Sequence, residues 1–415
     1  MRQLLSSNLN RWFITISIVC ILLMLSVSPV IGESSDDFSG ESSLNQQNQP
    51  LLSDQLELYL LRTEHYLFVN ASSDVENVTV RFVFPPEYGY QVPLYLELFN
   101  DTSANITAYC IENDDDDLNK LATFTIASMD QGDSNLIHFT CWVLIENHDF
   151  SDLPEKVKFP RRLQLPQETK TWLRASDVVQ KNRALIRLKA RQLRGINPNM
   201  IRFANRVAPF IKYHRFGLFL IQLWRGIFFS QDARTTLLIN GENVGRSHLA
   251  CALFRSQHIP SRVLLVHNDQ GFWTQMHYMV EYYVPDYGWV LLDSTKGQTP
   301  YETKRQIINR ICFPRDESDT KTDYIFPYMT GEERWLWIDN TSVSPYYHDC
   351  DRGSKSQMFS EAVVTTEEES GEYAVLISKL VFHQYQQYLG MNLTGENQQL
   401  FLNATGNQYL SLIHI

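Results

Sequence analysis

Two side chains that can move protons stand close together in the sequence, at His277 and Asp293. A histidine held in place by a carboxylate can take a proton from a cysteine thiol and return it, which is the chemistry of acyl transfer. Such a thiol is best placed at a helix N-terminus, where the helix dipole and the backbone N–H groups stabilise a thiolate. Cys251 lies upstream of both residues, within a run typical of a helix. The alternative is an ordinary buried histidine and an aspartate that ends a strand.

The residues around this pair predict a helix followed by three strands. A helix-like run ends at His258–Pro260, a strand covers Ser261–Val266, and a longer strand carries His277. A tight turn at Pro285–Gly288 then leads to a short strand that ends at Asp293. This order predicts an antiparallel hairpin next to a helix.

The length of the turn decides whether His277 and Asp293 share a face of the hairpin, because successive side chains alternate between faces. If Tyr283 pairs with Trp289 across a five-residue loop, Met279 lies opposite Asp293. His277 is then a diagonal neighbour of Asp293 on the same face, within side-chain reach. A two-residue loop would place the two side chains on opposite faces. We therefore predict an odd loop length.

The stretch Gly241–Gly297 resembles the transglutaminase-like core, a fold related to the papain-type cysteine enzymes. His277 in TQMHYMVEYY and Asp293 at the end of WVLLD match the catalytic histidine and aspartate of that family. Gly288-Trp289 matches its glycine–tryptophan turn. The resemblance implies a cysteine nucleophile seventeen positions before the proline that follows the helix.

Counted back from Pro260, the nucleophile position holds Asn243. Leu253, Arg255 and Ser247 fall where the family has a leucine, an arginine and a small residue, which fixes the register. An amide can cap a helix and exchange hydrogen bonds with a ligand, but it forms no thiolate and no acyl intermediate.

Cys251 is the alternative nucleophile. It lies eight residues after Asn243, about 12 Å along a helix and about 80° around it. A buried free cysteine more often serves as a small hydrophobe. Ser247 is on roughly the right face but has no activated thiol. Three further residues either line the site or serve packing: Arg246, His248 and Arg262.

The pattern of the whole chain predicts an α+β protein. Short alternating runs favour an N-terminal β-sandwich-like domain, followed by a helical connector. The transglutaminase-like core then has an N-terminal helix packed on an antiparallel sheet, and Tyr301–Cys312 is expected to begin as a helix. The expected divisions are residues 1–32, a signal peptide or signal anchor; 33–51, a polar linker; 52–153, the β-sandwich-like domain; 154–230, the helical connector; 231–345, the core; and 346–415, a C-terminal extension that can be incomplete.

The N-terminus has the features of an export signal. Arg2 and Arg11 flank the start of the apolar run Trp12–Val27, and Val30-Ile31-Gly32 suits cleavage. The run is near the lower limit for a membrane span, so a cleaved signal peptide and a single retained anchor both stay open. Either predicts an extracytoplasmic protein, secreted or anchored at the cell surface. Glycosylation sequons agree with export: Asn70, Asn77, Asn100, Asn105, Asn340, Asn392 and Asn403.

Five cysteines remain outside the targeting segment. An odd number means that at least one is unpaired or pairs between chains. Closeness in sequence suggests pairs of Cys110 with Cys141 and of Cys312 with Cys350, which leaves Cys251 free. Spacing alone leaves other pairings open.

The formal net charge of -11 argues against a nucleic-acid partner. The sequence shows no metal-ligand cluster, phosphate loop or dinucleotide fingerprint, so no cofactor is expected. Three functions stay open, because a fold does not fix function. The first is non-catalytic binding of a peptide, glycan or protein in the former active-site cleft. The second is an active cysteine peptidase, amidase or acyltransferase that uses Cys251. The third is adhesion through the β-sandwich and its glycans.

Overall fold

The structure, a computed structural model, describes residues 58–114, 118–146, 150–196, 198–225, 229–268, 275–302, 306–320, 336–345 and 355–364. By its internal contacts the chain divides into two compact units, Met1–Asp54 with Leu220–Ile227, and Gln55–Phe219 with Phe228–Ile415. Of the first unit only Leu220–Arg225 is described, as part of helix α4 (Phe216–Arg225). The expected signal segment and the polar linker lie outside the described residues. No helix among those described is long and apolar enough to cross a membrane.

Two antiparallel sheets in the second unit pack face to face. One has the order β12-β1-β6-β3, with β13 also paired to β1; its strands are β1 (Leu58–Ala71), β3 (Gln91–Leu98), β6 (Ser134–Glu146), β12 (Val343–Pro345) and β13 (Lys355–Val364). The other has the order β11-β2-β5-β4; its strands are β2 (Val75–Phe84), β4 (Ile106–Asn113), β5 (Lys120–Met129) and β11 (Leu336–Ile338). Phe139 of β6 meets Phe82 and Phe124 of the opposite sheet, with ring centroids 5.8 and 5.0 Å apart.

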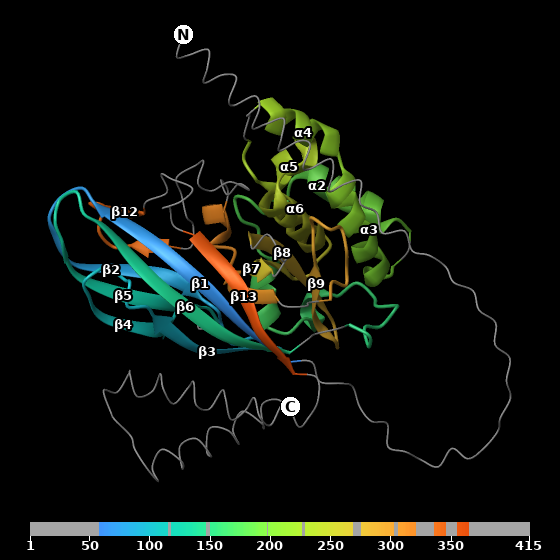
Figure 1. Cartoon of the computed structure of the whole chain (residues 1–415). Coiled ribbons are helices and arrows are strands. Elements are labelled where there is room, and N and C mark those ends of the chain that lie inside the picture. Colours follow the sequence, from blue (N-terminus) through green and yellow to red (C-terminus); the bar gives the residue numbers. More distant parts are fainter. Residues whose placement is uncertain are drawn as a thin grey trace, which may run out of the picture. The chain divides into compact units, whose positions relative to one another are not determined.

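Three strands that come late in the sequence belong to these two sheets. β12 and β13 pair with one edge of β1 (Figure 1), and β11 pairs with β2. The sequence-based division places β11 and β12 in the core range and β13 in the C-terminal extension. The boundary expected at residue 345 therefore does not coincide with a boundary of these two sheets. Strands on both sides of that residue pair with strands from the start of the chain.

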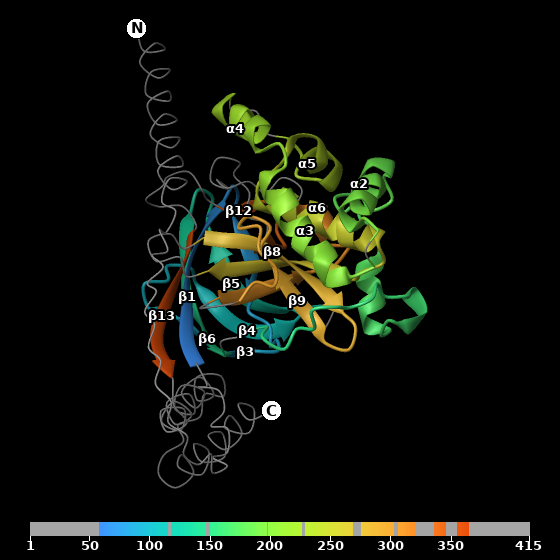
Figure 2. The ribbon, with the colours of Figure 1, turned by 90° about the vertical axis from the view of Figure 1, so that its right-hand side faces the viewer.

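The third sheet, with its helices, makes up the core that holds the site. Its order is β10-β7-β8-β9, all antiparallel, with strands β7 (Ser261–Asn268), β8 (Gln275–Val284), β9 (Gly288–Leu292) and β10 (Gln306–Cys312). Helix α6 (Asn243–Ser256) lies against β8 (Figure 2) and also contacts β7. Around α6 pack α2 (Ala184–Arg194), α3 (Met200–Tyr213) and α5 (Ala233–Ile239). Short 3-10 helices are η1 (Arg162–Gln164), η2 (Glu168–Leu173) and η3 (Glu317–Thr320). The expected helix on an antiparallel sheet is present.

The expectation of a helix beginning within Tyr301–Cys312 is wrong for β10, which is a strand. All seven of its residues are buried. Its polar residues suggest a solvated helix when only the local sequence is considered, but Asn309 and Arg310 have partners inside the fold. The side-chain amide of Asn309, for example, donates to Nδ1 of His267 at 2.7 Å. These long-range partners outweigh the local pattern.

Two buried ion pairs brace the core. Arg255, in the last turn of α6, pairs with Glu317 at 2.5 Å, and both side chains are fully buried. Arg262 of β7 pairs with Glu281 of β8 at 2.8 Å, and its guanidinium lies 3.9 Å from the ring centroid of Trp289. Arg262 therefore serves packing and does not line the site. Removing one partner of a buried pair leaves an uncompensated charge, so both pairs are strong constraints on this packing.

The expected disulfide between Cys110 and Cys141 is not formed, and both residues are free thiols. Cys110 is half-buried on the edge strand β4, whereas Cys141 is buried on β6 of the facing sheet. Residues close in sequence are thus placed on different sheets. Cys312 ends β10, and Cys350 lies outside the described residues, so that pairing is not described.

The sequons differ in their exposure. Asn77, Asn100 and Asn105 are exposed, while Asn70 and Asn340 are half-buried. Asn392 and Asn403 lie outside the described residues. Three of the candidate acceptors are therefore accessible on the folded protein.

Candidate functional site

Helix α6 supplies the first element of the site at its N-terminus. Asn243 is its first residue and is half-buried, and the preceding Glu242 makes no side-chain capping bond. Every side chain from Val244 to Arg255 is buried. Because the helix is enclosed in this way, packing fixes the position of its N-terminus and thus the place of Asn243.

Close packing of α6 depends on Gly245. A methyl group at this position would lie 2.5 Å from Oε1 of Gln231 and 2.7 Å from Oγ1 of Thr236. Gln231 uses the same Oε1 to accept the backbone N–H of Glu242 at 2.9 Å, and its Nε2 donates to the Phe229 carbonyl at 3.0 Å. Gln231 therefore holds the backbone just before the helix, in space that only a glycine at 245 leaves open.

The hairpin of β8 and β9 supplies the other two residues. Tyr283 pairs with Trp289 and Val284 pairs with Gly288, which leaves a three-residue connection. The odd loop length predicted from the sequence is confirmed. His277 and Asp293 consequently lie on one face, with His277 Nε2 3.3 Å from Asp293 Oδ1.

His277 links the helix to the hairpin. Its Nδ1 lies 3.3 Å from Nδ2 of Asn243, while its Nε2 faces Asp293. In the tautomer that is protonated on Nε2, Nδ1 accepts from the Asn243 amide and Nε2 donates to the Asp293 carboxylate. The side chain of His277 is 9% exposed and that of Asp293 is 1% exposed. The three side chains form one chain of hydrogen bonds at the edge of the buried core.

Asp293 is held as a carboxylate. Burial raises its pKa, but the hydrogen bond from His277 and the backbone N–H of Lys296 outweigh burial and leave the pKa below its usual value. Its Oδ1 also accepts the backbone N–H groups of Thr295 and Lys296 at 2.8 and 2.9 Å. Oδ2 is buried without a hydrogen-bond partner in the described structure. The carboxylate thus orients His277 and retains one unused acceptor.

This arrangement has the base and the orienting carboxylate of an acyl-transfer site, with an amide in place of the thiol. Asn243 presents one donor group and one acceptor oxygen, and it stands where the helix dipole favours negative charge. It has no atom that could become a thiolate. Among the described side chains, no group of three or more His, Cys, Asp or Glu could hold a metal ion.

Cys251 and Ser247, the two other nucleophile candidates, are both buried inside α6. Burial raises the pKa of the Cys251 thiol to about 12, so the thiolate is almost absent at neutral pH. The Ser247 hydroxyl donates to the Tyr278 carbonyl at 3.2 Å and lies 3.1 Å from the hydroxyl of Ser294. The structure places neither residue in the hydrogen-bond chain of His277.

Arg246 and His248 are also buried rather than open at the surface. Arg246 Nε donates to Oδ1 of Asn240 at 3.1 Å, and its guanidinium lies 5.5 Å from the ring centroid of Phe216. Burial lowers the pKa of Arg246 to about 10. Nδ1 of His248 lies 2.6 Å from the Gln231 carbonyl oxygen. Both side chains support the loop that precedes α6.

The sequence interpretation missed Gln231 and Asn240, which position the backbone before α6. A single glutamine or asparagine in a loop carries no local signal of such a role. The pair Gly241 and Gly245 does carry one, since glycines four residues apart at a helix start indicate a close approach. Both would clash with Gln231 and Thr236 if they had a side chain.

A helix packed on an antiparallel sheet, with a histidine and an aspartate at adjoining positions of a hairpin, defines a papain-like core. Residues 228–294 match the family model of the transglutaminase-like superfamily. The core of this chain is therefore a transglutaminase-like core. The matched residues contain Asn243, His277 and Asp293, and thus the whole hydrogen-bond chain.

One solved structure shares the fold. A protein provisionally named a cysteine protease, from Cytophaga hutchinsonii, is 14% identical, with a TM-score of 0.52 over 75% of this chain and 92% of its own. At that identity the likeness shows the fold alone. A second, provisionally named protease from Parabacteroides distasonis is 13% identical over 55% of this chain and 42% of its own, and its TM-score of 0.22 is too low for any inference. No curated protein matches the sequence.

Proposed function

We propose that this chain is an exported or cell-surface protein whose transglutaminase-like core performs no acyl transfer. Instead it binds a peptide, glycan or protein ligand around Asn243. The observation that carries this proposal is the 3.3 Å contact between Asn243 Nδ2 and His277 Nδ1. An amide occupies the place where a thiol would have to give its proton to the imidazole, and an amide is not a usable nucleophile.

Binding is supported by the groups that the site retains. Asn243 is half-buried, so a ligand can reach it, and its amide can both donate and accept. The hydrogen bonds from Asp293 through His277 to Asn243 hold that amide in one orientation. A preorganised polar group favours binding because little ordering remains to be done on association.

Purified full-length protein tests the absence of acyl transfer. We expect no hydrolysis of a glutamine-containing peptide, and no incorporation of a labelled primary amine into it, above the level of buffer. The control is the His277→Gln variant, which lacks the base. Turnover by the wild type that disappears in His277→Gln would show that the core is an active enzyme and would overturn the proposal.

The alternative is an active cysteine enzyme that uses Cys251. The buried thiol, with its pKa raised to about 12, gives this alternative little support. We expect iodoacetamide at pH 7 to leave Cys251 unmodified in the folded protein and to modify it after unfolding in urea. Fast modification of Cys251 in the folded protein, lost in His277→Gln, would favour the enzyme instead.

Export is proposed from the apolar N-terminal run and the sequons. Three sequons, Asn77, Asn100 and Asn105, are exposed on the folded protein, as glycan attachment requires. Expression through a secretory host should give a protein that loses apparent mass on enzymatic deglycosylation. The triple variant with glutamine at these positions should lose part of that shift. A secreted protein with no shift would contradict this part of the proposal.

A further inference from the structure

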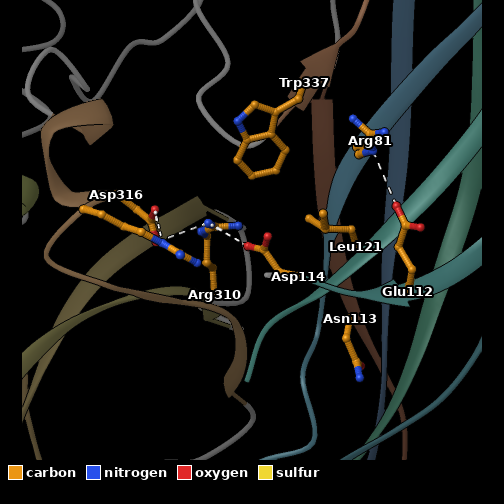
Figure 3. Close-up of a pocket in the computed structure, with 9 residues that line it drawn as sticks. Arg81, Glu112, Asn113, Asp114, Leu121, Arg310, Asp316 and Trp337 are labelled. Atoms are coloured by element: carbon orange, nitrogen blue, oxygen red, sulfur yellow. Dashed lines mark ion pairs between the residues drawn. The ribbon is translucent and has the colours of Figure 1, made fainter. Parts of the chain in front are cut away.

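A pocket of about 650 Å³ lies away from Asn243, His277 and Asp293. It opens between the sheet of β2, β4, β5 and β11 and the end of the core strand β10 (Figure 3). Its size is within the range of small-ligand sites. The residues that line it are mostly charged or polar: Arg81, Glu112, Asn113, Asp114, Leu121, Arg310, Arg315, Asp316 and Trp337.

Ion pairs arrange the charges of the wall. Arg310, whose side chain is only 5% exposed, lies 3.0 Å from Asp114 and 3.4 Å from Asp316. Arg315 also reaches Asp316, at 3.4 Å. Because burial and two carboxylates fix the Arg310 guanidinium, this wall is preorganised rather than assembled by the ligand.

A more open ion pair and an aromatic ring complete the pocket. Arg81 lies 3.4 Å from Glu112, and both side chains are nearly half exposed. Trp337 is half-buried on the edge strand β11, next to Arg81 in the sheet. The Arg310 guanidinium lies 4.9 Å from the centroid of the Trp337 ring, which faces the pocket in Figure 3. The ring adds an apolar surface to a polar wall.

The charge balance selects the class of ligand. Among the described residues that line the pocket, three guanidinium groups and three carboxylates balance to a formal charge of zero. An anion or a cation would have to compete with an existing ion pair to be bound. A neutral polyhydroxylated molecule can instead accept from the guanidinium groups and donate to the carboxylates at once, which gives charge-assisted hydrogen bonds without breaking a pair. Its C–H faces can lie against the indole ring, an aromatic surface with a large apolar area.

We propose that this pocket binds a neutral oligosaccharide. The proposal goes beyond the function proposed for the core, because no residue of the pocket belongs to the hydrogen-bond chain at Asn243. Trp337 is the stacking surface, Glu112 and Arg81 are the hydrogen-bonding pair at the mouth, and Arg310 holds the inner wall.

The test is isothermal titration of the full chain with four neutral tetrasaccharides: cellotetraose, maltotetraose, mannotetraose and chitotetraose. Tetragalacturonic acid is the anionic comparison, and the peptide Gly-Ser-Gly-Ser is the neutral peptide comparison. We expect saturable binding of at least one neutral tetrasaccharide, and little change in 0.5 M salt (roughly a 4 Å Debye length), because no net charge is paired on binding.

Variants locate the binding. Trp337→Ala should weaken it by roughly tenfold, which corresponds to about 1.4 kcal/mol for a lost aromatic contact. Glu112→Gln, on a side chain that is 44% exposed, should weaken it severalfold and serves as the second variant if Trp337→Ala does not fold. The matched control is Trp142→Ala, since Trp142 lies on the opposite sheet and carries Arg62 5.6 Å from its ring.

Binding that is weakened in Trp337→Ala or Glu112→Gln and unchanged in Trp142→Ala would support the proposal. The absence of binding by all four neutral tetrasaccharides would overturn it. A preference for tetragalacturonic acid or for the peptide would also overturn it. So would binding that Trp142→Ala weakens as much as Trp337→Ala.

Discussion

Replacing Asn243 by cysteine tests whether this residue stands at a nucleophile position. The new thiol would lie at the N-terminus of α6, next to Nδ1 of His277, which is 3.3 Å from the present amide. Such surroundings lower a thiol pKa to about 3.5–7.5. We take about 5.5, the middle of that range, against about 8.5 for an ordinary thiol.

The magnitude follows from two opposing effects at pH 6. An ordinary thiol is about 0.3% thiolate there, whereas a thiol with a pKa of about 5.5 is about 75% thiolate, roughly 240-fold more. A fall of about three pKa units reduces the intrinsic nucleophilicity roughly 20-fold. The net expectation is alkylation about tenfold faster than that of an ordinary thiol. Between pH 6 and 8 the rate should stay almost level, while that of an ordinary thiol rises roughly 75-fold.

The assay is the rate of iodoacetamide modification, followed at each cysteine by peptide mass spectrometry. The wild type gives the background of the native cysteines. The Asn243→Cys, His277→Gln double variant is the matched control, because it keeps the thiol and removes the imidazole. A folded Asn243→Cys protein whose rate rises with pH like an ordinary thiol would refute the view that this site is a nucleophile position.

Three further predictions concern stability, measured by urea unfolding. Gly245→Ala should lower the free energy of unfolding by about 1–3 kcal/mol through overpacking, whereas Gly217→Ala in α4, which meets no atom within 4 Å, should raise it by about 0.5–1 kcal/mol. Equal effects would contradict the packing at Gly245. Glu317→Gln should lower it by about 3–5 kcal/mol, because Arg255 then loses its buried carboxylate; a loss below about 1 kcal/mol would contradict this. Burial lowers the pKa of His267 to about 4, so the folded protein keeps this ring neutral while the unfolded chain binds a proton below about pH 6.5. The contribution of the neutral His267 ring to the free energy of unfolding is therefore complete above that pH. It is lost as the pH falls towards the folded-state pKa, with about 2 kcal/mol lost at pH 5. If the free energy of unfolding falls no more steeply with decreasing pH in the wild type than in His267→Gln, this prediction is wrong.

The hairpin geometry of the site was predictable because it depends on local rules. Strand alternation and the length of one loop are enough to place His277 and Asp293 on the same face, and the observed register agrees. The position of Asn243 needed the resemblance to a family, since no local rule says which residue of a helix start meets a histidine thirty-four positions later.

The parts that sequence reasoning missed depend on distant partners. The edge strand β4 mixes apolar and polar residues without regular alternation, and none of its residues is fully buried, so no clear pattern marks it. In β10, polar residues are buried, and Asn309 has a distant partner in His267 that no local pattern reveals. The membership of β11, β12 and β13 in the first two sheets is equally non-local. The hydrophobicity pattern of a short segment therefore predicts burial only where distant strands do not alter which of its residues are buried.

The pairing of β13 with β1 has a consequence for how the protein is made. Seen along the chain, the core is an insertion between the first and last strands of one sheet. At about 5–20 residues per second, the ribosome needs roughly 15–60 s to extend the chain from Ala71 to Val364. During that interval one edge of β1 has no strand to pair with, and an open edge invites association with other chains. We expect the core to fold first, because its strands are neighbours in sequence. Strands β12 and β13 then pair with the open edge of β1.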